Sequence, residues 1–247
     1  MTGLPALLAL LGTWPGSPGV VASASAPAPA AHARLAPIKR IETTQPTVAL
    51  TFDACATRTH TAGFDRAVYQ VLKQEAVPAT IFVSGRWVEV HGPEMTELAA
   101  DPLIAFGDHS FDHPHMNKIP KTRMAQQIDQ TEAALARYGK KSVAFRPPFG
   151  EWNRRLVEVA KQKGLPTVTW DVVSGDPSAH TTAPRLVRNV LDRTRAGSIV
   201  IFHINGRGRK TAEALPEILR TLRDRGLRFV FLSDLLAEPT AQASVTH

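Results

Sequence analysis

Two histidines, His109 and His113, stand four residues apart and could bind one divalent metal ion. On a helical turn, residues at i and i+4 share a face, so both imidazoles could reach an ion at about 2.0–2.1 Å. Ser110 follows His109, so the segment lacks the glutamate of the HExxH metalloprotease helix. The pair therefore indicates a metal site whose general base lies elsewhere, with surface or capping histidines as the alternative.

Asp53 could supply that base, because it follows the apolar run Val48-Ala49-Leu50-Thr51-Phe52. A carboxylate at the end of a buried strand is costly unless it is paired or functional. A helix-capping or loop aspartate is the alternative interpretation.

From residue 46 onward, short β-branched runs alternate with longer helical patterns, which is typical of βα units around a parallel sheet. The pattern predicts helices over Thr122–Tyr138, Asn153–Lys163, Ala183–Thr194 and Thr211–Arg225. It predicts seven strands: Thr47–Phe52, Ala79–Val83, Leu103–Phe106, Val143–Arg146, Thr167–Trp170, Ser198–Phe202 and Arg228–Leu232.

The positions of polar residues favour a barrel over an open doubly wound sheet. Five of them follow, or end, five different strands: Asp53, His109, Arg146, Asp171 and His203. In a barrel all these strand ends surround one mouth, whereas distant strands of an open sheet could not contribute to one site. We therefore expect a single α/β domain built as a barrel or distorted barrel.

Five motifs, in this order and spacing, resemble those of the polysaccharide deacetylases, the NodB-homology domains of carbohydrate esterase family 4. The resemblance covers roughly residues 46–236. The motifs are Thr51-Phe52-Asp53, His109-xxx-His113-Pro114, Arg146-Pro147-Pro148-Phe149-Gly150, the segment from Trp170 to Pro177, and Ile201-Phe202-His203.

The resemblance implies a distorted (β/α)7-8 barrel that hydrolyses the acetamide of N-acetylglucosamine units in peptidoglycan, chitin or a similar polymer. It implies one divalent ion, zinc or else cobalt, nickel or manganese, bound by His109 and His113. Asp53 resembles the general base and His203 the general acid of the family. Arg146 is similar to the arginine that holds the base, and Asp176 to the aspartate that orients the acid.

The resemblance also implies substrate-binding residues. A backbone N–H in the loop from Pro147 to Gly150, that of Phe149, would bind the oxyanion of the tetrahedral intermediate. Pro148 and Gly150 of the same loop are also expected to bind the substrate, and Trp170 either stacks on a sugar ring or packs in the core.

The chain departs from the family pattern at Ala54, where most members have a second aspartate that binds the metal. A methyl group cannot coordinate, so the third position falls to Asp53, water, Asp108 or nothing. Catalytic zinc usually has three protein ligands, so we expect weaker or different metal binding. Pro177 and Val173 also differ from the family pattern, and Arg207 and Arg209 lie near the predicted acid.

The first 45 residues differ in composition from the rest. Residues 1–26 predict a signal peptide, with an apolar stretch at Leu4–Trp14 but no preceding basic residue, and 27–45 predict an Ala/Pro-rich tether. The catalytic domain is expected over 46–236 and a disordered tail over 237–247. A secreted, periplasmic or cell-envelope location follows, and no segment is long enough to span a bilayer.

Composition limits the partners. The net charge of +7 favours acidic partners, but only 6% of residues are aromatic and no basic run is interleaved with aromatics, so nucleic acid is not expected. The single cysteine, Cys55, excludes an intramolecular disulfide and is expected to be buried. A monomer acting on a polysaccharide is the prediction.

Two other functions fit the same sequence. Ala54 would suit a metal-independent hydrolase of a small cyclic amide, although the His109 and His113 pair argues for a metal. A catalytically inactive glycan-binding module is the third hypothesis.

Overall fold

The computed structural model describes residues 35–57, 59–60 and 62–238. The predicted signal peptide, residues 27–34 of the predicted tether and residues 239–247 of the predicted tail lie outside this range.

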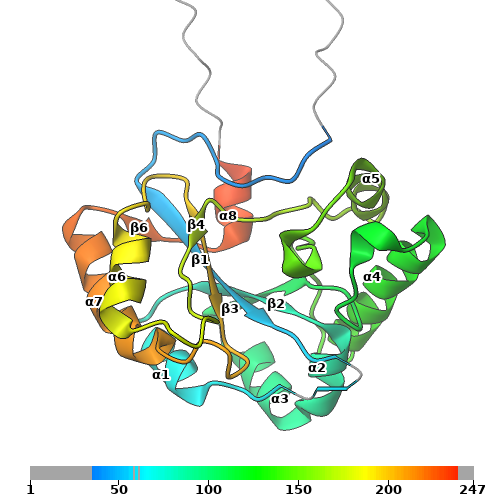
Figure 1. The fold of residues 1–247 in the computed structure, drawn as a ribbon, viewed down its shortest axis with the longest axis horizontal. Helices are drawn as coiled ribbons and strands as arrows, with labels where there is room; N and C mark the ends of the chain where they lie inside the picture. The colour runs from blue at the N-terminus through cyan, green and yellow to red at the C-terminus, as the bar shows by residue number, and fades with distance from the viewer. Residues whose placement is uncertain (1–34, 58, 61, 239–247) are drawn as a thin grey trace, which may run out of the picture. The chain divides into compact units, whose positions relative to one another are not determined.

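A parallel sheet forms the centre of the domain (Figure 1). Its order is β3-β2-β1-β5-β4, and β6 pairs with the first residues of β1. Every ladder is parallel, so the carboxyl ends of the strands lie at one end of the sheet. The strands are β1 (Thr47–Ala54), β2 (Ala79–Val83), β3 (Ile104–Asp108), β4 (Val172–Val173), β5 (Ile199–His203) and β6 (Arg228–Phe229).

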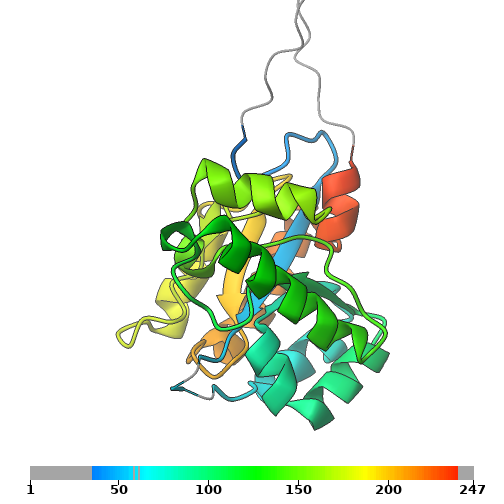
Figure 2. The same ribbon diagram turned by 90° about the vertical axis from the view of Figure 1, so that its right-hand side faces the viewer.

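Helices connect the strands and cover the sheet (Figures 1 and 2). The cap residues Asn153 and Thr182 begin α5 and α6, because their side chains accept the free N–H groups of Leu156 and Arg185. The helices are α1 (Arg66–Gln74), α2 (Gly85–Val90), α3 (Gly92–Ala100), α4 (Lys121–Ala136), α5 (Arg154–Gln162), α6 (Ala183–Leu191), α7 (Thr211–Asp224) and α8 (Leu232–Ala237). None of these helices is long and apolar enough to cross a membrane.

The predicted α/β fold is confirmed, and the barrel is distorted. Continuous ladders join all six strands, whereas only isolated bridges link β3 to Phe145 and Phe145 to Thr167. The predicted strands Val143–Arg146 and Thr167–Trp170 were therefore wrong as strands, since each makes bridges only. The segment that starts at Thr167 continues into β4. Because β4 pairs with β5 and β5 pairs with β1, the barrel returns to its first strand.

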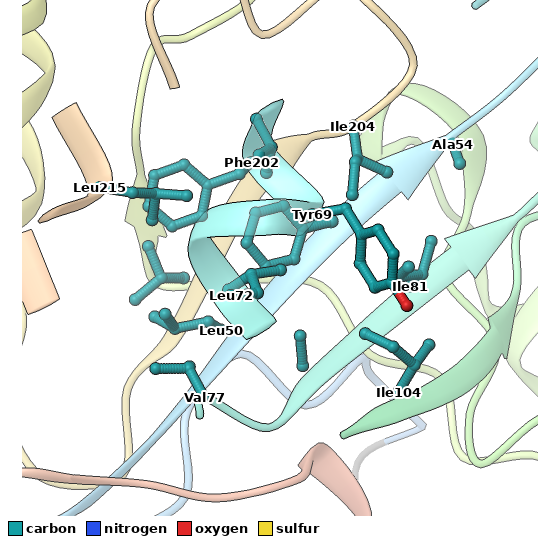
Figure 3. Packing of buried hydrophobic residues seen from close by; sticks show 14 of the residues in the cluster. Leu50, Ala54, Tyr69, Leu72, Val77, Ile81, Ile104, Phe202, Ile204 and Leu215 are labelled. Atoms are coloured by element: carbon teal, nitrogen blue, oxygen red, sulfur yellow. The ribbon is translucent and has the colours of Figure 1, made fainter. Parts of the chain in front are cut away.

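Alternation along β1 separates the core from the site. Leu50, Phe52 and Ala54 belong to the main apolar cluster, together with Tyr69 and Leu72 of α1 (Figure 3). Thr51 and Asp53 point to the opposite face, since successive strand residues alternate. Burial of the apolar face under the helices thus fixes the direction in which Asp53 points.

The residues before β1 pack on the domain, so the predicted tether is wrong for this part. Ile38 and Arg40 form bridges with Val168 and Ser198, and Ile41 is buried. Gly197 permits this contact: a Cβ there would lie 1.8 Å from the carbonyl oxygen of Ile41, and its φ is +78°. The domain therefore begins before residue 46.

Candidate active site

A pocket of about 290 Å³ lies at the carboxyl ends of β1 and β5. Asp53 and His203 are paired residues of these neighbouring strands, which brings them into the same pocket. The other predicted site residues that line it are His109, His113, Phe149, Trp170 and Asp176.

Arg146 holds Asp53 in a buried ion pair. Its Nη1 donates to Asp53 Oδ1 at 2.8 Å, and its Nη2 donates to Thr51 Oγ1 at 2.8 Å. The guanidinium is fully buried and lies 3.9 Å from the ring centroid of Phe82. Three side chains of β1 and β2 thus hold the guanidinium, and Asp53 keeps one oxygen, Oδ2, that Arg146 does not contact.

The Asp53 carboxyl is ionised at neutral pH. Burial alone would raise its pKa, but the positive charges of His109, when protonated, and of Arg146 outweigh burial and lower the pKa below its usual value. Arg146 is the permanent charge of the two. A buried carboxylate held as an anion with one free oxygen is what a general base requires.

The loop that carries His109 and His113 is not helical, so the predicted helical turn was wrong. Ser110 and His113 both adopt left-handed backbone conformations, with φ of 63° and 58°. The imidazole rings of His109 and His113 nevertheless lie close together, with their centroids 4.9 Å apart. Non-glycine residues with a positive φ, such as Ser110 and His113, are strained and persist only where surrounding contacts hold them.

Those surrounding contacts come from α4 and from the loop itself. Gln127 Oε1 accepts the backbone N–H groups of Phe111 and Asp112, at 3.0 and 2.8 Å. Ser110 Oγ accepts the N–H of His113 at 3.2 Å. The loop is thereby fixed before any ligand binds.

The chemistry of the two histidines fits a divalent cation. His109 Nδ1 lies 2.8 Å from the carbonyl oxygen of Arg146, which can only accept, so this nitrogen carries the proton. Burial lowers the pKa of His109, and burial followed by the charge of His109 lowers that of His113 to about 3. Both rings are therefore neutral at pH 7, as ligands must be.

The unprotonated Nε2 of His109 then lies 3.5 Å from Asp53 Oδ2. Both atoms are hydrogen-bond acceptors, so no hydrogen bond joins them. Two ligands of one tetrahedral ion with bonds near 2.1 Å are about 3.4 Å apart. In residues 35–57, 59–60 and 62–238, however, no three His, Cys, Asp or Glu side chains form a ready metal group. The His109 and His113 pair, with Asp53 beside it, is thus the donor set available.

The other possible third ligands lie elsewhere. Ala54 is fully buried in the apolar cluster of Phe52. Asp108 does not line the pocket; its Oδ1 accepts the N–H of Ser110 at 2.7 Å. Burial raises the pKa of Asp108 well above its usual value, which disfavours the carboxylate form that a metal would need.

Asp176 binds His203 through two hydrogen bonds. Its Oδ1 accepts from Nδ1 of the ring at 2.9 Å, and its Oδ2 accepts from the backbone N–H of the same residue at 2.6 Å. Burial alone would lower the pKa of His203, but the hydrogen bond and charge of Asp176 raise it above its usual value. His203 is thus arranged as a proton donor.

The predicted substrate-binding residues divide into two groups. Phe149 and Trp170 line the pocket, and the ring of Phe149, 54% exposed, lies edge-on to His113 with centroids 4.5 Å apart. Pro148 is buried and Gly150 packs on Trp170, where a Cβ would lie 2.9 Å from the indole. These two residues shape the loop but do not line the pocket.

One polar residue at a predicted strand end lies away from the site. Asp171 accepts hydrogen bonds from Ser198 Oγ and from the N–H of Ile199, at the amino end of β5. The prediction that Asp171 ends a strand at the barrel mouth was wrong, because Asp171 precedes β4, which starts at Val172.

Sequence reasoning missed several residues that support the site. Thr211 Oγ1 donates to Asp176 Oδ2 at 2.9 Å, and Gly208 leaves room there, since a Cβ would lie 2.8 Å from that oxygen. Asn205 Nδ2 donates to the carbonyl oxygen of Cys55 at 2.9 Å. Burial raises the pKa of the Cys55 thiol to about 11, so the thiol is neutral.

The polysaccharide deacetylase family model matches residues 40–168, more than half of the chain. This protein belongs to the polysaccharide deacetylase family. The match contains the first three of the five motifs, and together with solved structures of the family it confirms the resemblance and the fold.

Among curated relatives, the chain is similar to the peptidoglycan-N-acetylglucosamine deacetylase PgdA of Listeria monocytogenes. The two are 31% identical over 192 residues, which make up 77% of this chain and 39% of the relative. The chain thus spans less than half the length of that polysaccharide deacetylase.

Two solved structures similar to this chain are described differently, one as a deacetylase and one as a pseudoenzyme. The Bc1960 peptidoglycan N-acetylglucosamine deacetylase superposes with a TM-score of 0.73, at 27% identity, over 83% of this chain and 94% of that one. A protein of Bacillus anthracis, described as a family 4 carbohydrate esterase pseudoenzyme, superposes with a TM-score of 0.73, at 25% identity, over 84% of this chain and 71% of that one. A mutant of the latter is described as having restored enzymatic activity.

Proposed function

We propose that this protein is a metal-dependent N-deacetylase of a polysaccharide that contains N-acetylglucosamine, such as peptidoglycan or a chitin-like glycan. One observation carries the proposal: an ionised Asp53 and a His203 whose pKa is raised line the same pocket. A base and an acid with pKa values moved apart are what amide hydrolysis needs.

The proposed reaction replaces the acetamide C–N bond by a C–O bond. Asp53 Oδ2 takes a proton from the attacking water, while Arg146 stays bound to Oδ1 and keeps the carboxylate oriented. His203 then donates its proton to the departing amine, which leaves free acetate and an amino sugar. The backbone N–H of Phe149 is the proposed donor to the oxyanion.

His109 and His113 are the proposed ligands of one divalent ion, zinc or else cobalt, nickel or manganese. When bound, such an ion polarises the acetamide carbonyl and makes a nearby water more acidic. With Ala54 in place of a second aspartate, Asp53 is the nearest further donor to the His109 ring.

The proposed location is outside the cytoplasm, in the periplasm, the cell envelope or the medium. Support comes from the apolar segment Leu4–Trp14 with its Ala/Pro-rich continuation, and from the class of substrate, which is an extracellular polymer.

The test is acetate release from N-acetylglucosamine oligomers and from peptidoglycan strands. We expect release that a chelator abolishes and that one added divalent ion restores. Release that a chelator leaves unchanged would favour the metal-independent hydrolase. Glycan binding without release under any metal would favour an inactive binding module, a role consistent with the likeness to a pseudoenzyme.

A further inference from the structure

A second cavity of about 410 Å³ opens beside the catalytic pocket. Arg207 and Pro177 line both cavities, so the two are adjacent. We call the second one the cationic groove, because its ionisable lining residues in the described part of the chain are His60, Arg207 and Arg209.

We propose that the cationic groove binds a carboxylate of the glycan next to the acetamide that is hydrolysed, with Arg207 as the principal contact. The inference rests on the proposed deacetylase function and makes the substrate an acidic glycan in preference to a neutral one. Residues that line the groove but not the pocket, such as Arg209, take no part in the reaction itself.

The loop that carries Arg207 is fixed in place at several points. Asn205 binds the carbonyl oxygen of Cys55, and Ile204 donates its N–H to the carbonyl oxygen of Asp53 at 3.1 Å. Gly208 accepts the N–H of Thr211 at 2.9 Å, so the loop is held on both sides of the arginine. A guanidinium on such a loop loses little backbone freedom when it binds an anion.

The charge of Arg207 is available to a ligand. In the described part of the chain its guanidinium makes neither a hydrogen bond nor an ion pair, and the side chain is exposed. Its charge still reaches the catalytic pocket, where it opposes protonation of His113 and His203. An arginine with no protein partner, beside a pocket for a neutral acetamide, suits an anionic group on the same substrate.

The glycan chemistry identifies that group. Peptidoglycan alternates N-acetylglucosamine with a sugar that bears a lactyl ether, so each acetamide lies within one sugar of a lactyl carboxyl. This carboxyl is free where the stem peptide has been removed, and the stem peptide supplies other carboxylates where it remains. Chitin has none of them.

The experiment compares four soluble glycans of matched length. These are neutral N-acetylglucosamine oligomers, peptide-free peptidoglycan strands, the same strands with their carboxylates reduced to alcohols, and peptide-bearing strands. For wild type we expect kcat/KM on the peptide-free strands to exceed that on the reduced strands about 5- to 10-fold, an advantage that shrinks as salt is added.

Arg207→Ala should bring this ratio to about one, mainly through KM, and Arg207→Lys should keep part of it. Arg209→Ala should have a smaller effect. Arg185→Ala removes an equally exposed charge from α6, outside both cavities, and should leave the ratio unchanged. A preference for peptide-bearing strands over peptide-free ones would assign the bound carboxylate to the peptide.

Two results would overturn the inference: equal kcat/KM on acidic and reduced strands for wild type, or a parallel loss in Arg207→Ala on neutral and acidic glycans. If wild type releases no acetate from any glycan, the deacetylase proposal fails on its own. Calorimetric binding of the same glycans then decides about the groove, because weaker binding of the reduced strands would still support it and equal binding would refute it.

Discussion

Asp176 contacts His203 twice, through the Nδ1 of its ring and through its backbone N–H, at 2.9 and 2.6 Å. The two hydrogen bonds fix the plane of the imidazole and leave Nε2 as the nitrogen that can reach a substrate. The same carboxylate raises the pKa of the ring, so orientation and protonation of the proposed acid depend on one residue.

Asp176→Asn should therefore shift the pH profile of the reaction. The proposed acid works only while protonated, so kcat falls as pH rises through the pKa of His203. Loss of the carboxylate lowers this pKa and moves the alkaline limb to lower pH, with kcat reduced at least about 10-fold at pH 7. Asp224→Asn, on the exposed surface of α7, is the control. An unchanged alkaline limb in Asp176→Asn would show that His203 is not the acid.

Removal of Arg146 should destabilise the protein. Arg146→Met leaves the buried Asp53 carboxylate unpaired, which costs about 3–5 kcal/mol of unfolding free energy in such cases. Asp53→Asn in the same background removes the buried charge and should restore part of the loss. Denaturant unfolding of the two single variants and the double variant measures this coupling, and strictly additive effects would contradict it.

Asp53→Asn alone should keep the fold and lose the reaction. The amide retains the shape of the side chain but cannot accept a proton, so kcat should fall about 10²- to 10⁴-fold. Glycan binding measured by calorimetry should change little. Turnover within a few-fold of wild type would assign the base to another group.

Metal binding should depend on the histidine pair and on no other histidine. Zinc added to wild type should raise the unfolding free energy by about 2.7 kcal/mol at 100 times its Kd. His109→Ala and His113→Ala should each abolish this stabilisation. His180→Ala, at an exposed position, should not change it. Equal stabilisation of all three variants by zinc would place the ion elsewhere.

Gly208→Ala should disturb the acid without touching the proposed metal ligands. The added methyl would lie 2.5 Å from both the carbonyl oxygen of His203 and Thr211 Oγ1, so the loop must shift. We expect lower kcat, reduced stability and unchanged zinc binding. Gly92→Ala, at the start of α3, is the matched control, because its Cβ would lie at an ordinary contact distance, 3.7 Å, from the hydroxyl oxygen of Tyr138.

The sequence predicted the carboxyl ends of β1, β2, β3 and β5 closely, since β-branched runs and the residues that follow them are local signals. Asp53 and His203 were placed together for this reason. The helical turn at His109 was wrong, because Gln127 of α4 holds that loop in a conformation that spacing alone does not reveal. Asn205, Gly208 and Thr211 were missed for a similar reason: their contacts join residues far apart in the chain.

The two boundaries of the described domain lie at the end of the sheet opposite the pocket (Figure 1). Arg40 bridges to Ser198 at the start of β5, and Glu238 accepts a hydrogen bond from Thr47 at the start of β1. The eight residues of β1 span roughly 23 Å between that end and the mouth. The described chain thus enters and leaves the domain one strand length away from the opening, so neither boundary occupies the surface around the mouth.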